Sequence, residues 1–187
     1  HQAVESILQQ TYTDFEYIIV NDGSSNHVAN ILNDYARRDK RISIIHQENC
    51  GLITSLNNGI QQARGIYIAR MDADDISLPQ RLDYQVQYLQ TYPHIALYGS
   101  AIEYIDGNNT VHSRFLYPTS NAELQTKMKQ SNYFAHSSIM MRASVVRHVG
   151  GYSSLYPHAE DYELWLRIAQ NHDIANCEDV LLQYRVH

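Results

Sequence analysis

The chain has 187 residues, of which 44% are hydrophobic and 18% are charged, and this balance is typical of a folded globular protein. Its formal net charge of −6 argues against nucleic acid as the main partner, and no apolar run reaches the roughly 18 residues that would span a membrane. Cys50 and Cys177 lie too far apart for a zinc or redox motif, so we expect reduced thiols and a cytoplasmic setting.

The first half of the chain alternates short apolar runs with amphipathic segments. Its opening residues already follow a helical pattern, so we expect that a structural element preceding residue 1 is missing from this sequence. The pattern predicts strands at 16–20, 42–45 and 66–71, and helices at 28–35, 52–63 and 82–89. This order predicts an α/β fold with a mostly parallel central sheet flanked by helices, which binds ligands at the carboxyl ends of its strands.

The second half is less regular. The turn at 106–108 predicts a hairpin formed by 95–105 and 111–116. Later patterns predict helices at 121–130, 143–149 and 160–171, and strands at 138–142 and 181–186. We therefore expect a smaller antiparallel or mixed portion beside the parallel sheet.

Three carboxylates, Asp72, Asp74 and Asp75, follow the apolar run 66–71 directly. Like charges this close are costly to bury unless a cation neutralises them, and carboxylate oxygens suit Mg2+ or Mn2+. The alternative is that these aspartates only start the next helix, because Asp is a good helix cap and Pro79 follows. Asp22, just after another predicted strand, is expected at the same edge, although Asp22-Gly23 alone is also typical of a simple turn.

Several short motifs occur in a specific order along nearly the whole chain. They are Gln10-Thr11-Tyr12 to Asp22-Gly23-Ser24, Asn49-x-Gly51, Met71-Asp72-Ala73-Asp74-Asp75 with Pro79-x-Arg81-Leu82, Gly150-Gly151-Tyr152, and Glu160-Asp161-x-x-Leu164-x-x-Arg167. Together they resemble the inverting, nucleotide-sugar-dependent glycosyltransferases of family 2, which have the Rossmann-like GT-A fold. The resemblance implies one domain over 1–187, with a nucleotide-sugar-binding half at 1–92 that lacks its first strand and an acceptor-side half at 93–187.

The resemblance also assigns roles on the donor side. Asp22 would read the base, because a carboxylate accepts a hydrogen bond from uracil N3–H, which cytosine lacks. Asp72 would be the ribose-side member of the metal motif, and Asp74 the direct ligand of Mn2+ or Mg2+. Asp75 is expected to cap the following helix, and Arg81 to be a surface partner of these acids without a catalytic role.

On the acceptor side, Asp161 resembles the general base of the family, with Glu160 a poorer second choice. An isolated Glu-Asp pair is more often a solvated helix start, so only the order of the motifs favours the catalytic interpretation. Arg185 would bind phosphate and His187 would approach the metal or the diphosphate, although a histidine at a chain end is usually just solvated. His136 resembles an acceptor-side position, and a packed core histidine is an equal alternative.

One departure from the family pattern is Leu56-Asn57, where many relatives carry Arg-Asn. Any nucleotide contact of that arginine is expected to be lost or supplied elsewhere.

The sequence thus predicts a metal-assisted inverting glycosyltransferase. It would move a sugar from a UDP-sugar to a glycan or lipid-linked acceptor in surface polysaccharide synthesis, in the cytoplasm or peripherally at the inner face of the membrane. Two alternatives remain: a nucleotidyltransferase of related fold, for which no Gly-rich basic loop is found, and a non-catalytic nucleotide-binding module.

Overall fold

The computed structural model describes residues 1–187. In chain order its elements are α1 (Gln2–Leu8), β1 (Tyr17–Asp22), α2 (Asn26–Arg38), β2 (Ile42–Gln47), α3 (Leu52–Gln62), β3 (Tyr67–Ala69), β4 (Ile76–Ser77), α4 (Arg81–Thr91), β5 (Ile95–Ile105), β6 (Val111–Phe115), α5 (Asn121–Lys127), the 3-10 helix η1 (His136–Ser138), β7 (Met140–Arg142), α6 (Ala143–His148), α7 (Glu160–Ala169) and β8 (Asp173–Arg185).

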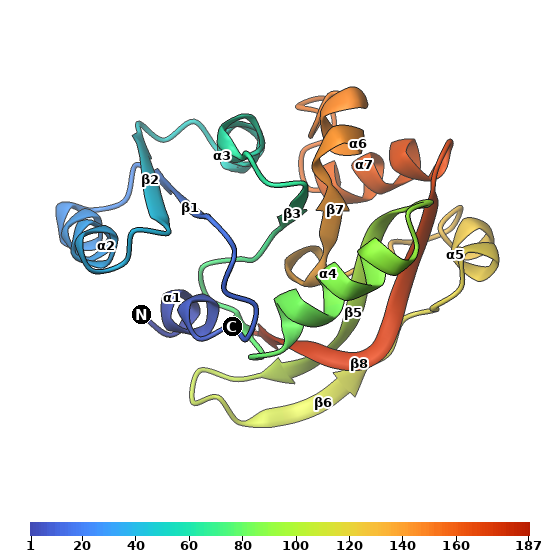
Figure 1. Cartoon of the computed structure of the whole chain (residues 1–187), viewed down its shortest axis with the longest axis horizontal. Helices are drawn as coiled ribbons and strands as arrows, with labels where there is room; N and C mark the ends of the chain where they lie inside the picture. Colours follow the sequence, from blue (N-terminus) through green and yellow to red (C-terminus); the bar gives the residue numbers. More distant parts are fainter.

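The strands form two sheets (Figure 1). β1 and β2 pair in parallel as a two-stranded sheet, with α2 and α3 beside it. The other six strands form a mixed sheet in the order β3-β7-β5-β8-β4, and β6 pairs with β5. The central pair of this sheet, β5 and β8, is parallel, whereas the β5–β6, β5–β7, β3–β7 and β4–β8 pairs are antiparallel.

The hairpin predicted at 95–105 and 111–116 is confirmed, and so is a helix that begins at Glu160. The strand expected at 66–71 is shorter. β3 keeps only three residues and pairs antiparallel with β7, not with β1 or β2, so Asp72 follows the sheet after a short loop. The last strand is longer than expected, because β8 begins at Asp173 and continues past the exposed pair Glu178-Asp179 through a bulge opposite Ser100 and Ala101.

The main core lies between the six-stranded sheet and the helices of the second half. Trp165, Leu164 and Ile168 of α7 are fully buried there against residues of β5 and β7 such as Leu97 and Met141. Burial of apolar surface on this scale is the dominant stabilising contribution to a fold. The packing fixes α7, and therefore fixes the position of the acidic pair at its first turn.

No helix in the structure is both long enough and apolar enough to cross a membrane.

Candidate active site

Asp72 is held from its buried side by two neighbours. Arg70 Nη1 donates to Asp72 Oδ2 at 2.6 Å, while Nη2 donates to Oδ1. The hydroxyl of Ser137, in η1, donates to Asp72 Oδ2 at 2.9 Å and accepts from the Asp72 amide at 3.0 Å. A bidentate arginine–carboxylate pair fixes orientation as well as charge, so the direction of the Asp72 carboxylate is set before any ligand arrives.

Asp74 contacts the end of the chain. His187 Nε2 lies 2.9 Å from Asp74 Oδ2, and both side chains are substantially exposed. One carboxylate and one imidazole fit a divalent cation that completes its shell with water and substrate phosphate. Asp72 is less suited to that shell, because Arg70 and Ser137 already occupy its carboxylate. No group of three or more His, Cys, Asp or Glu side chains is close enough to share a metal.

The expected role of Asp75 as a helix cap is wrong. The strand β4 intervenes, α4 begins only at Arg81, and no side chain caps it. Asp75 is instead 1% exposed, and its Oδ1 accepts a hydrogen bond of 2.8 Å from the Arg185 amide. Burial raises the pKa of the Asp75 carboxyl. Asp75 therefore ties the acidic loop to the end of β8.

The expectation of a surface position for Arg81 is also wrong. Arg81 is 0% exposed, and its Nη2 donates to the backbone carbonyls of Arg70 and Ile139 at 2.7 and 3.1 Å. Burial lowers the pKa of Arg81 to about 9. Arg81 braces the backbone beneath the acidic loop.

Arg185 is engaged in structural contacts. Its guanidinium donates to the carbonyl of Asp74 at 2.8 Å, to the carbonyl of Asp106, and to the side chains of Asn109 and Gln2. These bonds join the acidic loop, the β5–β6 turn and α1. Phosphate binding by Arg185 stays a prediction, and it would require some of these bonds to be exchanged.

Asp22 is the last residue of β1, and it anchors the start of α3. Its Oδ1 accepts from the Cys50 amide and from Gln47 Nε2, both at 2.8 Å, and its Oδ2 accepts from the Gly51 amide at 2.9 Å. The hydrogen bond from Cys50 leads the contacts that lower the pKa of Asp22. Oδ2 keeps acceptor capacity for a ligand, and no hydrogen bond joins Asp22 to the other predicted site residues.

Asp161 lies in the first turn of α7, where Glu160 beside it is buried. Asn132 Nδ2 donates to Asp161 Oδ2 at 2.8 Å, and the Tyr162 amide donates to Oδ1 at 2.6 Å. Burial raises the pKa of Asp161, and these two hydrogen bonds and the charge of Arg70 oppose the rise. A carboxylate with a raised pKa suits proton transfer.

His136 packs in an aromatic cluster. Its Nε2 lies 2.7 Å from the Tyr152 hydroxyl, and its ring lies 5.7 Å from that of Trp165, edge to face. Burial lowers the pKa of His136 well below its usual value, so the ring is neutral at pH 7. This environment fits the packed-histidine alternative, and an acceptor contact by His136 stays a prediction.

Tyr152 is positioned from α3. Asn57 accepts from the Tyr152 amide at 2.9 Å and donates to its carbonyl at 2.9 Å. Gly151, with φ of +69°, lies so close that a Cβ there would stand 2.5 Å from Asn57 Oδ1. Asn57, in the Leu56-Asn57 departure from the family pattern, therefore holds the turn that leads into α7.

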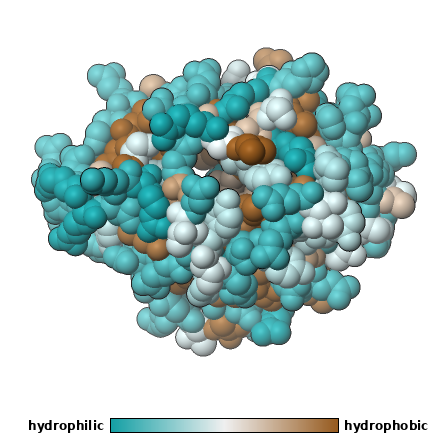
Figure 2. Space-filling view, viewed as in Figure 1, coloured by the Kyte–Doolittle hydropathy of each residue, from teal (hydrophilic) through white to brown (hydrophobic).

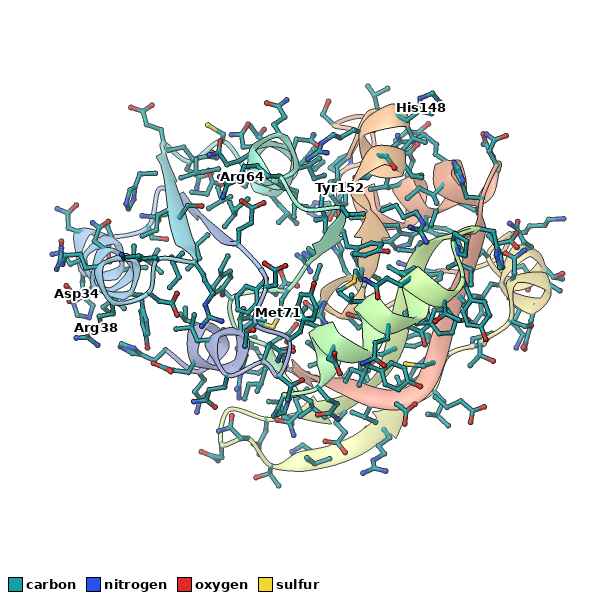
Figure 3. All side chains as sticks on the ribbon, viewed as in Figure 1. Asp34, Arg38, Arg64, Met71, His148 and Tyr152 are labelled. Atoms are coloured by element: carbon teal, nitrogen blue, oxygen red, sulfur yellow. The ribbon has the colours of Figure 1, made fainter.

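The segment 132–138 contacts two of the predicted site carboxylates, because Ser137 binds Asp72 and Asn132 binds Asp161. In Figure 3, Met71, next to Asp72, lies in the middle of the molecule, with Tyr152 above it. The surface on this side is mostly hydrophilic, with a hollow near its centre (Figure 2).

Sequence reasoning missed Arg70, Ser137 and Asn132. The signal for Arg70 was a charged residue inside the apolar run 66–71, directly before the acids. Nothing in the sequence alone marks Ser137 or Asn132.

Residues 1–150 match the family model described as Glycosyl transferase family 2. Among curated proteins, the O-antigen biosynthesis glycosyltransferase WbnJ of Escherichia coli is 35% identical over 99% of this chain and 73% of its own length. The amylovoran biosynthesis glycosyltransferase AmsE of Erwinia amylovora is 33% identical over 98% of this chain and 69% of its own length. An uncharacterized glycosyltransferase of Haemophilus influenzae is 35% identical, and the chain spans 61% of its length.

Solved structures show the same fold. S. aureus TarS in complex with UDP matches with a TM-score of 0.78 over 99% of this chain and 56% of that one, at 17% identity. The TarS complex with UDP-GlcNAc gives a TM-score of 0.79 at 17% identity, over 99% of this chain and 54% of that one. The predicted α/β GT-A fold is confirmed by these matches, while the central sheet is mixed and not mostly parallel, because only its β5–β8 pair is parallel. The chain belongs to glycosyl transferase family 2 and has the GT-A fold.

Proposed function

We propose that this protein is an inverting glycosyltransferase that moves a sugar from a UDP-sugar to a glycan or lipid-linked acceptor in surface polysaccharide synthesis. The observation that carries the proposal is the segment 132–138, which binds Asp72 through Ser137 and Asp161 through Asn132. The named relatives act in O-antigen and amylovoran biosynthesis, and the TarS structures hold UDP and UDP-GlcNAc, which supports the substrate classes.

Asp161 is the proposed general base. Each of its carboxylate oxygens accepts one hydrogen bond, from Asn132 or Tyr162, and keeps acceptor capacity for an acceptor hydroxyl. The ionised carboxylate takes the hydroxyl proton as the oxygen attacks the anomeric carbon, and the diphosphate leaves from the opposite face of the sugar. One such displacement inverts the anomeric configuration.

Asp22, Asp74 and His187 are the proposed donor-side contacts. Asp22 would accept from uracil N3–H through Oδ2, and Asp74 with His187 would hold Mg2+ or Mn2+ against the diphosphate. A bound divalent cation supplies Lewis-acid neutralisation of the leaving diphosphate.

A screen of UDP-sugars with candidate glycan and lipid-linked acceptors tests this function. We expect acceptor-dependent release of UDP, and a product with inverted anomeric configuration by NMR. Asp161→Asn is the paired variant, in which transfer should fall by roughly 10²–10⁴-fold. Pyrophosphate release from UTP and a sugar 1-phosphate would instead identify a nucleotidyltransferase, and a retained anomeric configuration would contradict the inverting mechanism.

Cys50 offers a local test of the nucleotide site. Cys50 is exposed and its amide binds Asp22, whereas Cys177 is buried and burial raises its pKa to about 11. A thiol reagent should therefore label Cys50 first, since the thiolate is the reactive form. UDP should slow that labelling. Equal labelling rates with and without saturating UDP would place the nucleotide elsewhere.

A further inference from the structure

Arg70 is an unusual cation, because it is almost completely buried beside an exposed carboxylate. Its side chain is 8% exposed, whereas the side chain of Asp72 is 38% exposed. The guanidinium therefore approaches Asp72 from the interior, and the solvent side of the carboxylate stays open. Arg70 Nε is buried without a hydrogen-bond partner, so the side chain is held by its two terminal nitrogens.

Ser137 completes the contacts to Asp72. Its oxygen accepts from the Asp72 amide at 3.0 Å and from Arg70 Nη1 at 3.2 Å, and its hydroxyl donates to Asp72 Oδ2 at 2.9 Å. All hydrogen-bonding capacity of the hydroxyl is then used within the protein. Asp72 Oδ2 receives two donors, from Arg70 and Ser137, whereas Oδ1 receives only Arg70 Nη2.

The backbone of Arg70 is fixed as well. The Arg70 amide donates to the Ile139 carbonyl at 3.2 Å, and the Arg70 carbonyl accepts from the buried Arg81 at 2.7 Å. The ion pair consequently cannot swing out of the site without breaking contacts on both sides. A group held by several contacts in this way is preorganised for a ligand.

We propose that Arg70 and Ser137 are positioning residues that hold Asp72 as an acceptor for the ribose hydroxyls of the donor and withdraw it from direct metal ligation. The ion pair with Arg70 offsets most of the negative charge with which Asp72 would otherwise attract a divalent metal ion. The free acceptor site on Oδ1 still faces solvent and suits a neutral hydroxyl donor. Asp74 with His187 then remains for the metal. This inference rests on the proposed function, because that function supplies the ribose-bearing donor that Asp72 would contact.

Calorimetric titration with UDP and with 2′,3′-dideoxy-UDP tests the ribose contact. The wild-type protein should prefer UDP, on the order of tenfold, because the hydroxyl bonds to an ionised acceptor. Arg70→Lys keeps the charge but loses the bidentate geometry, and Ser137→Ala removes the hydroxyl. Both variants should lose most of that preference, and Asp72→Asn should lose it as well. Arg114→Gln is the matched control, because this exposed arginine of β6 pairs with Glu103 of β5 and not with Asp72.

A titration with Mn2+ alone, monitored by electron paramagnetic resonance, tests whether Asp72 is withdrawn from metal ligation. This experiment needs no nucleotide. Arg70→Gln should bind Mn2+ more tightly than wild type, because the charge of Asp72 is then uncompensated. Asp72→Asn should weaken Mn2+ binding only modestly, because it leaves the Arg70 charge uncompensated, whereas Asp74→Asn should abolish binding. Thermal melts identify any variant that fails to fold. If Arg70→Gln does not fold, the Mn2+ affinity of Asp72→Asn alone decides whether Asp72 is a metal ligand.

Two results would overturn the inference. One is an unchanged preference for UDP over its dideoxy analogue in folded Arg70→Lys and Ser137→Ala. The other is a loss of Mn2+ binding in Asp72→Asn equal to that in Asp74→Asn, which would make Asp72 a metal ligand. A wild-type protein that binds Mn2+ but no UDP would contradict the proposed function and with it the ribose role, while the Mn2+ series would still decide whether Arg70 withdraws Asp72 from the metal.

Discussion

Asn132 Nδ2 lies 2.8 Å from Asp161 Oδ2, and this hydrogen bond orients the carboxylate at the start of α7. The same segment of chain reaches Asp72 through Ser137. A shift of this segment would therefore move both carboxylates. One short piece of backbone therefore helps to set the spacing between Asp72 and Asp161.

Replacing Asp161 with Asn should lower transfer by roughly 10²–10⁴-fold, because the amide keeps the shape of the side chain but cannot take a proton. UDP binding should survive, since the base acts on the acceptor. Steady-state kinetics and a UDP titration of the same preparation check the two halves of this statement. Near-normal turnover in Asp161→Asn would exclude it as the base, and Glu160→Gln would become the next variant to measure.

Asn132→Ala should move the acid limb of the pH–kcat profile to higher pH. The hydrogen bond from Asn132 favours the ionised carboxylate, so its loss raises the pKa of Asp161 further above the ordinary value. A base works only when deprotonated, and activity is lost as the pH falls through that pKa. The charges of Arg70 and Glu160, which also affect the pKa of Asp161, are unchanged in this variant. An acid limb at the wild-type position would show that Asp161 does not control the profile.

Asp22→Asn should lower the melting temperature at pH 7, because an amide cannot accept from the Cys50, Gly51 and Gln47 donors as a carboxylate does. The pKa of Asp22 is lowered in the folded state. Its stabilisation is therefore present above the unfolded pKa of about 3.9 and is lost as the pH falls below it. Melting curves from pH 7 to pH 3 should show the wild-type advantage shrinking. A difference that does not vary with pH would argue against the ionised anchor.

Gly151→Ala should destabilise the protein more than Gly150→Ala. Both glycines have positive φ, so an alanine costs roughly 1–2 kcal/mol at either position. At Gly151 the new Cβ also meets Asn57 Oδ1 at 2.5 Å, whereas at Gly150 it meets nothing within 4 Å. The clash would disturb the bonds between Asn57 and Tyr152, each worth about 0.5–1.5 kcal/mol. Urea unfolding measures both variants, and equal losses would show that the Asn57 contact does not matter.

The sequence could place Asp161 because the signal is local. An acidic pair followed by apolar residues at helical spacing predicts a helix start, and α7 begins at Glu160. The acidic loop after β3 was predicted for the same reason. The contacts around this loop were not predicted, because Ser137 and Arg185 reach it from distant parts of the chain.

Two errors have clear physical causes. Arg81 was expected at the surface because arginine is rarely buried. Here Nη2 donates to the carbonyls of Arg70 and Ile139 and Nε donates to Gln85, while Nη1 is buried without a hydrogen-bond partner. The early part of β8 was missed because Glu178 and Asp179 interrupt its apolar pattern. These residues form a bulge, which removes them from the ladder while the strand continues.

A calorimetric titration of this protein with UDP, with Mn2+ and with EDTA, tests the central claim most directly, and Asp74→Asn is the paired variant. Asp74 is half-exposed, so the substitution should leave the fold intact while removing the carboxylate that contacts His187. We predict that UDP binds tightly only when Mn2+ is present, and that Asp74→Asn loses this dependence together with the affinity. Equal binding of UDP in EDTA, or in Asp74→Asn, would contradict the account.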